Sequence, residues 1–141
     1  MDNTFTSTKS GYIFFVFNSY IYFNFNVYIL IIMSREFEQI SLKPGFMKHN
    51  GGLLFKTISE NEYQFKTSIK ENHLNTAGIV HGGFIATFVD AGAGTAAHRV
   101  ANGSPCVTIS LELKFISTVK LGQELIGSTK IQKKTKSMVF L

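Results

Sequence analysis

The chain has 141 residues, a formal net charge of +5 at pH 7, a single cysteine and no tryptophan. This length suits one domain that buries a hydrophobic core, and the lone Cys106 excludes both a disulfide framework and a multi-cysteine metal site. The only tight group of positive charges lies at residues 130–136 and contains no aromatic residue, so the basic balance does not indicate a nucleic-acid partner.

Residues 1–32 differ in composition from the rest and are expected to form a separate N-terminal extension. The stretch 12–33 has no charged residue and is rich in Phe, Tyr, Ile and Asn. Its length is enough to span a bilayer, yet several Asn residues interrupt it, and it lacks the basic front and small-residue cleavage site of a secretory signal. Three interpretations stay open: translated upstream sequence before a working start at Met33, a membrane anchor, or a packed N-terminal element.

Residues 33–141 are expected to form one domain that begins with a short helix and two strands. Phe37 and Ile40 lie at helical spacing behind Ser34, which can cap a helix over residues 34–40. Residues 52–58 and 62–69 are predicted strands separated by a turn at Asn61. In the second strand, four side chains alternate with polar ones and define one face: Tyr63, Phe65, Thr67 and Ile69.

The longest predicted helix follows a polar loop and covers residues 83–100. Its second half, residues 91–97, contains only small residues, including Gly92 and Gly94. A helical glycine costs roughly 1 kcal/mol relative to alanine, so we expect the sheet or a partner chain to approach closely there. The Gly-Ser-Pro sequence at 103–105 ends the helix.

Three further strands are predicted after this helix, over residues 107–116, over residues 123–132 and from residue 137 onward. The first of them places five apolar side chains on one face: Val107, Ile109, Leu111, Leu113 and Phe115. One central helix among antiparallel strands predicts an α+β fold.

Two other kinds of site are disfavoured by the sequence. His49, His73 and His98 lack metal-ligand spacing, so no metal site is expected. Residues 92–97 mimic a dinucleotide-binding glycine motif, but the strands that follow do not form the βαβ units that such a site requires.

The start of the long helix carries features suited to catalysis. Gly82 and Gly83 let a ligand approach the backbone closely. The first N–H groups of a helix have no intrahelical partners and lie at the positive end of its dipole. Such donors can stabilise a carbonyl oxygen that gains negative charge, as hydrolysis of an ester or thioester requires.

Asp90 is an acid within an apolar part of the same helix, which suggests a functional role or a partner. It follows His81 by nine residues, half a turn out of phase, and lies about 12 Å along the helix axis from Gly82. One helix therefore cannot bring both groups to one carbonyl. The spacing predicts a site shared between two subunits.

A motif runs through this region: Asn-x5-His-Gly-Gly, then Asp seven residues after the second Gly, at Asn75, His81 to Gly83, and Asp90. It resembles the PaaI-like thioesterases of the hotdog superfamily. The resemblance covers about residues 36–141 and continues to a Lys-Leu-Gly turn at Gly122. It implies a hotdog fold, in which a curved antiparallel sheet wraps a long central helix, and chains that pair into homodimers or homotetramers.

The resemblance also implies roles for the loop and the helix start. Asn75 and the Gly82 amide would polarise the thioester carbonyl, and Gly83 would contact the substrate beside them. His81 would orient this loop rather than act as the base.

The remaining implied roles fall further along the chain. Asp90 of the neighbouring subunit would activate water or attack the carbonyl directly, and Thr108 would help to hold the water. Lys114 and Lys120 are candidates for contacting the CoA phosphates. The expected reaction is hydrolysis of acyl-CoA to a free acid and CoA, with CoA as part of the substrate, no cofactor and no metal.

The resemblance differs at the C-terminus, because similar chains continue beyond the strand that starts at Ser137. The domain at 33–141 is therefore expected to lack a C-terminal strand. Two alternatives stay open: a non-catalytic acyl-CoA-binding remnant, and a membrane-tethered hotdog protein. The expected location is cytoplasmic, with membrane-associated or organellar alternatives, and membrane contact is expected only through residues 12–33.

Overall fold

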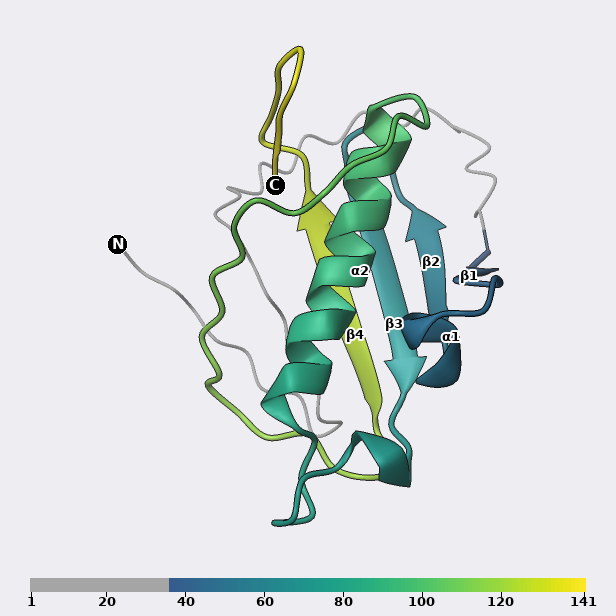
Figure 1. Cartoon of the computed structure of the whole chain (residues 1–141), viewed down its shortest axis with the longest axis vertical. Coiled ribbons are helices and arrows are strands. Elements are labelled where there is room, and N and C mark those ends of the chain that lie inside the picture. Colours follow the sequence, from purple (N-terminus) through teal and green to yellow (C-terminus); the bar gives the residue numbers. More distant parts are fainter. Residues whose placement is uncertain (1–35) are drawn as a thin grey trace, which may run out of the picture.

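A computed structural model describes residues 36–141, in which one long helix, α2 (Gly82–Val100), lies across a four-stranded antiparallel sheet (Figure 1). The sheet has the order β1-β2-β3-β4 and consists of Glu38–Ile40, Leu53–Thr57, Glu62–Ser68 and Glu124–Lys130. The remaining elements are short: α1 (Phe46–His49), the 3-10 helix η1 (Glu71–His73), and a hairpin of β5 (Lys133–Lys134) and β6 (Val139–Phe140). This arrangement confirms the predicted α+β class.

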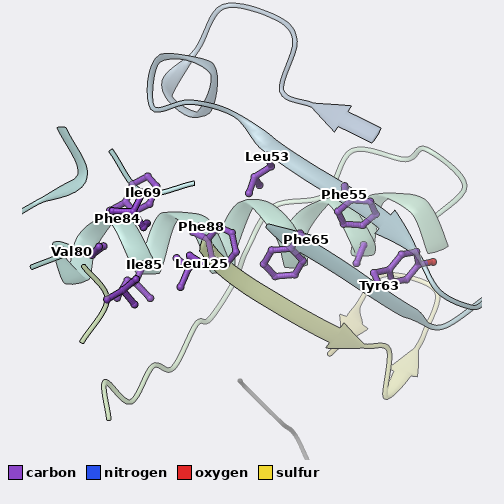
Figure 2. Close-up of a cluster of buried hydrophobic side chains, with 12 residues drawn as sticks. Leu53, Phe55, Tyr63, Phe65, Ile69, Val80, Phe84, Ile85, Phe88 and Leu125 are labelled. Atoms are coloured by element: carbon purple, nitrogen blue, oxygen red, sulfur yellow. The ribbon is translucent and has the colours of Figure 1, made fainter. Parts of the chain in front are cut away.

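The core lies between α2 and the sheet and includes four phenylalanines among aliphatic side chains (Figure 2). Phe65 of β3 packs against Phe88 of α2, with ring centroids 4.9 Å apart. A Cβ atom added at Gly92 would lie 2.3 Å from the Phe65 ring. The sheet therefore approaches α2 closely at Gly92, as the sequence predicts, whereas nothing lies within 4 Å of a Cβ added at Gly94.

The alternation predicted for the second strand is confirmed in β3. Tyr63, Phe65 and Thr67 are buried, and Ile69, just past the end of the strand, is buried as well. Strand β3 pairs with β2 on one side and with β4 on the other, so it is the most extensively paired strand of the sheet.

The helix predicted over residues 34–40 is wrong for the part that the structure describes. Glu38–Ile40 form the edge strand β1 instead. This strand pairs with β2, with Glu38 opposite Phe55. Phe37, which the helical spacing relied on, lies beneath the amines of Lys56 and Lys66. Two apolar residues three apart fit a helix or a strand start, and pairing with β2 decides between them.

The strand predicted over residues 107–116 is also wrong, because this segment forms no strand in the chain. It runs as coil beside α2, from the end of the helix toward the base of β4 (Figure 1). Four of its five alternating apolar side chains are exposed, with Val107 at 88% and Ile109 at 82%, whereas Leu113 is half-buried. A strand needs a neighbour to satisfy its backbone, and no strand of the described part of the chain lies beside this one.

The strand predicted over residues 123–132 is confirmed as β4, and the one expected from residue 137 is present in shortened form as β6. The N-terminal segment 12–33 and the start of the predicted first helix lie outside the described residues. Within residues 36–141, no helix is both long enough and apolar enough to cross a membrane.

Candidate active site

His81 caps the start of α2 and fixes the geometry of the two glycines. Its backbone is extended, and its Nδ1 accepts a hydrogen bond from the Gly83 N–H at 2.8 Å. This bond occupies the Gly83 amide, and within residues 36–141 no acceptor contacts the Gly82 N–H. The helix start thus offers one fixed backbone donor, at Gly82, for a ligand carbonyl.

Phe115 lies beside Gly82 at the helix start. Its ring lies 3.4 Å from where a Cβ at Gly82 would be. The ring is 57% exposed, so it borders the Gly82 donor without burying it. The sequence showed Phe115 only as part of an apolar alternation, and no local signal pointed to this contact.

Asn75 is held in a turn that leaves its amide NH2 available. Its Oδ1 accepts hydrogen bonds from the backbone N–H groups of Ala77, at 2.9 Å, and Ile79, at 3.3 Å. Since the oxygen is occupied by two donors, the orientation of the amide is fixed. In the part of the chain that the structure describes, the Asn75 Nδ2 has no acceptor, and it can donate to a substrate.

The loop that carries Asn75 folds back on itself before α2 begins. Leu74 and Val80 form an isolated antiparallel bridge, and the Asn75 N–H donates to the Ile79 carbonyl at 2.8 Å. The Val80 N–H donates to the carbonyl of Val119, a buried residue before β4. Backbone bonds therefore connect the Asn75 turn to the helix start and to the body of the domain.

Asp90 is exposed on α2 and, among residues 36–141, its side chain makes one hydrogen bond. The Thr108 hydroxyl donates to Asp90 Oδ1 at 2.5 Å. Both residues line an open hollow of about 690 Å³ between α2 and the segment after it, together with His98 and Cys106. The structure thus brings together two residues that were predicted separately for the site, although Asp90 is exposed rather than enclosed by the core.

The hollow at Asp90 does not include the helix start. Asn75, His81 and Gly82 are absent from its lining, in agreement with the separation of about 12 Å along α2. The two lysines suggested for CoA binding lie elsewhere as well: Lys114 is exposed and 3.7 Å from Glu112, and the exposed Lys120 does not line the hollow. One chain therefore holds the two halves of the candidate site apart.

His73 is a buried residue of this region that the sequence did not single out. Only 1% of its surface is exposed, and its ring stacks on Phe84 of α2 with centroids 3.8 Å apart. Burial lowers its pKa below the usual value for histidine, and the nearby Lys70 lowers it further. Its place two residues before Asn75 was the only available signal.

Comparison with known proteins shows that the chain is similar to thioesterases. Residues 77–141 match the model of the Thioesterase superfamily. Mouse acyl-coenzyme A thioesterase 13 is 27% identical over 107 residues, covering 75% of this chain and 76% of the mouse protein. The human protein of that name is 31% identical over 72 residues, which is 51% of each chain.

Solved structures agree with this comparison. Zebrafish thioesterase superfamily member 2 has a TM-score of 0.62 at 21% identity, covering 70% of this chain and 71% of that one. The mouse structure of member 2 has a TM-score of 0.51 at 26% identity, covering 60% and 61%. The fold is therefore that of the hotdog proteins. The C-terminal part of the chain thus matches the thioesterase superfamily model, and the chain is similar to proteins named acyl-coenzyme A thioesterase 13.

Proposed function

We propose that this protein hydrolyses acyl-CoA thioesters to a free acid and CoA at a site shared between two copies of the chain. The observation that carries the proposal is the Asp90–Thr108 pair at an open hollow, on the same helix whose start presents a free Gly82 N–H. The similarity to acyl-coenzyme A thioesterase 13 supports acyl-CoA as the substrate class. CoA is part of the substrate, and the proposed reaction uses no further cofactor.

The helix start stabilises the carbonyl oxygen of the thioester. Neither the Gly82 N–H nor the Asn75 NH2 has a hydrogen-bond acceptor among the described residues. Neighbouring hydrogen bonds fix the orientation of both donors. Donors held in place stabilise the negative charge that develops on this oxygen in the transition state. His81 contributes by holding the turn, since its Nδ1 accepts from Gly83.

Asp90 of the second copy acts as the general base. It takes a proton from water as the water oxygen bonds to the acyl carbon. The tetrahedral intermediate then collapses and the carbon–sulfur bond breaks. The CoA sulfur takes the proton that Asp90 held and leaves as a thiol. Thr108 donates to Asp90 Oδ1 and keeps lone pairs that can accept from the attacking water.

Two observations support a second copy as the provider of Asp90. The two halves of the site lie apart on one helix, so a single chain cannot apply both to one carbonyl. Most apolar side chains of residues 107–116 are also exposed, among them Val107 and Ile109. Contiguous exposed apolar surface of this kind marks an association face.

Replacing the base tests the proposal directly. We expect Asp90→Asn to lower kcat on butyryl-CoA, octanoyl-CoA, palmitoyl-CoA and benzoyl-CoA by about 100-fold or more, because general-base catalysis contributes roughly that factor. Thiol release is the measurement. Glu60→Gln, which removes an exposed acid from the β2–β3 turn, is the matched control and should leave kcat unchanged.

Two results would count against this assignment. Equal turnover by the native chain and Asp90→Asn would remove Asp90 from the mechanism. Calorimetric binding of these thioesters without any release of CoA by the native chain would instead identify a binding module.

A further inference from the structure

The His73 side chain is the most buried polar side chain in residues 36–141, and both of its ring nitrogens are used. Nδ1 accepts a hydrogen bond from the Lys70 backbone N–H at 3.1 Å. Nε2 lies 3.0 Å from the carbonyl oxygen of Asn50. A carbonyl can only accept, so Nε2 carries the proton, and the neutral ring satisfies both contacts at once.

These contacts join three parts of the chain at one ring. Asn50 lies in the turn between α1 and β2, Lys70 follows β3, and Phe84, which stacks on the ring, lies in the first turn of α2. The backbone of His73 adds a fourth connection, because its carbonyl accepts the His81 N–H at 2.8 Å. The residue therefore contacts both ends of the loop that leads from η1 to α2.

We propose that His73 is a positioning residue for the thioester carbonyl site: it sets where Asn75 and the Gly82 amide point. The inference rests on the proposed function, in which these two groups bind the carbonyl oxygen. His73 touches no substrate and acts through the loop. Its ring aligns the loop against Asn50 and Phe84, while its carbonyl fixes His81, which precedes Gly82.

Simple core packing would not need a histidine at this position. A phenylalanine would fill a similar volume and keep the stacking on Phe84, but it would leave the Lys70 N–H and the Asn50 carbonyl without partners. Buried polar groups without partners cause the backbone to shift or to open to water. A shift of the loop would move the donors away from the position of the developing charge, which lowers catalysis even when substrate still binds.

The test compares His73→Phe with His73→Gln in the full chain, each with and without Asn75→Ala. Hydrolysis of octanoyl-CoA gives kcat and KM, and binding of the octyl-CoA thioether, which cannot be hydrolysed, reports ground-state affinity. We expect His73→Phe to lower kcat about 10-fold to 100-fold while KM and thioether binding change less than about twofold, because oxyanion donors act mainly in the transition state.

Two features of the result separate positioning from general stability. Gln keeps an amide donor for the Asn50 carbonyl. The decrease in log kcat caused by His73→Gln should therefore be less than about half of the decrease caused by His73→Phe. In the Asn75→Ala background, His73→Phe should cost less than about threefold, since part of what it positions is already absent. His49→Phe makes the same exchange at an exposed histidine of α1 and should have no effect.

The inference is overturned if His73→Phe leaves kcat unchanged, or if it lowers kcat by the same factor in both backgrounds. Should His73→Phe fail to fold, the same comparison of backgrounds is made with His73→Gln, and equal factors again overturn it. Failure of the proposed function looks different. In that case Asn75→Ala and Asp90→Asn leave kcat unchanged on their own, whatever happens at His73.

Discussion

Two histidines near the start of α2 meet their hydrogen-bonding needs in opposite surroundings. His81 is exposed and uses Nδ1 to cap the helix. His73 is buried, and its neutral form matches one donor and one acceptor of the backbone. Because protonation of His73 would place a hydrogen on Nδ1 against the Lys70 N–H, only the neutral ring suits the folded chain.

This difference predicts an acid limit to stability. Burial lowers the pKa of His73 in the folded state, the Lys70 charge lowers it further, and the Asn50 carbonyl opposes both; the α2 side of the ring is faced by Phe84, which is uncharged. The unfolded chain therefore binds the proton first. Stability is fully present above about pH 6.5 and falls below it, with a slope smaller than the one-proton limit of about 1.4 kcal/mol per pH unit.

Urea unfolding of the native chain and His73→Gln between about pH 7.5 and about pH 5 measures this effect. The native chain should lose more stability over that range, because the variant has no buried group to protonate. His49→Gln removes an exposed histidine instead and should retain the native profile. If the free energy of unfolding falls equally with pH in the native chain and in His73→Gln, other groups cause the loss of stability in acid.

At the scale of elements, the contact between α2 and the sheet depends on an aromatic ring set between two glycines. Added Cβ atoms at Gly92 of α2 and at Gly127 of β4 would lie 2.3 and 2.4 Å from the Phe65 ring. Both distances are far shorter than van der Waals contact. The ring thus determines how closely the helix can approach β3 and β4.

Two glycine substitutions in α2 separate helix propensity from packing. Gly92→Ala should destabilise the chain by about 1–2 kcal/mol, because overpacking at Phe65 outweighs the roughly 1 kcal/mol gained in helix propensity. Gly94→Ala, which meets no atom within 4 Å, should stabilise it by about 0.5–1 kcal/mol. Denaturant unfolding reports both values, and an equal gain in the two variants would show that Phe65 moves aside freely.

The elements that the sequence predicted are those with long internal periodicity. Helix α2 and strands β2, β3 and β4 repeat their patterns over enough residues to exclude the alternatives. β1 has three residues and forms only because β2 offers an edge. Residues 107–116 show the opposite failure: their alternation is strong, but it carries no information on whether a neighbouring strand exists.

The same distinction holds within the site. The spacing of Asn75, His81 and Asp90 could be read in the sequence because these residues lie within one continuous stretch of the chain. The contacts of His73 and Phe115 could not be read, since both depend on parts of the chain that meet only after folding.

At the scale of the whole molecule, the proposed site is not complete within one chain. The proposed carbonyl donors lie at and before the start of α2, whereas Asp90 lies further along that helix, and several apolar side chains of residues 107–116 face solvent. A two-fold pair of chains would present each helix start to the other chain's carboxylate, giving two equivalent sites. The proposal of a shared site can thus be tested without knowing the geometry of the pair.

Mixing two inactive variants makes that test. Asn75→Ala lacks a carbonyl donor and Asp90→Asn lacks the base, so each alone should fall about 100-fold or more in kcat. In a shared-site dimer, unfolding and refolding the two together in equal amounts should restore about a quarter of native activity, because half of the pairs are mixed and each mixed pair holds one intact site. Refolding each variant alone is the control. If each chain holds a complete site of its own, the mixture recovers nothing, since every carboxylate-bearing chain then lacks its Asn75 donor.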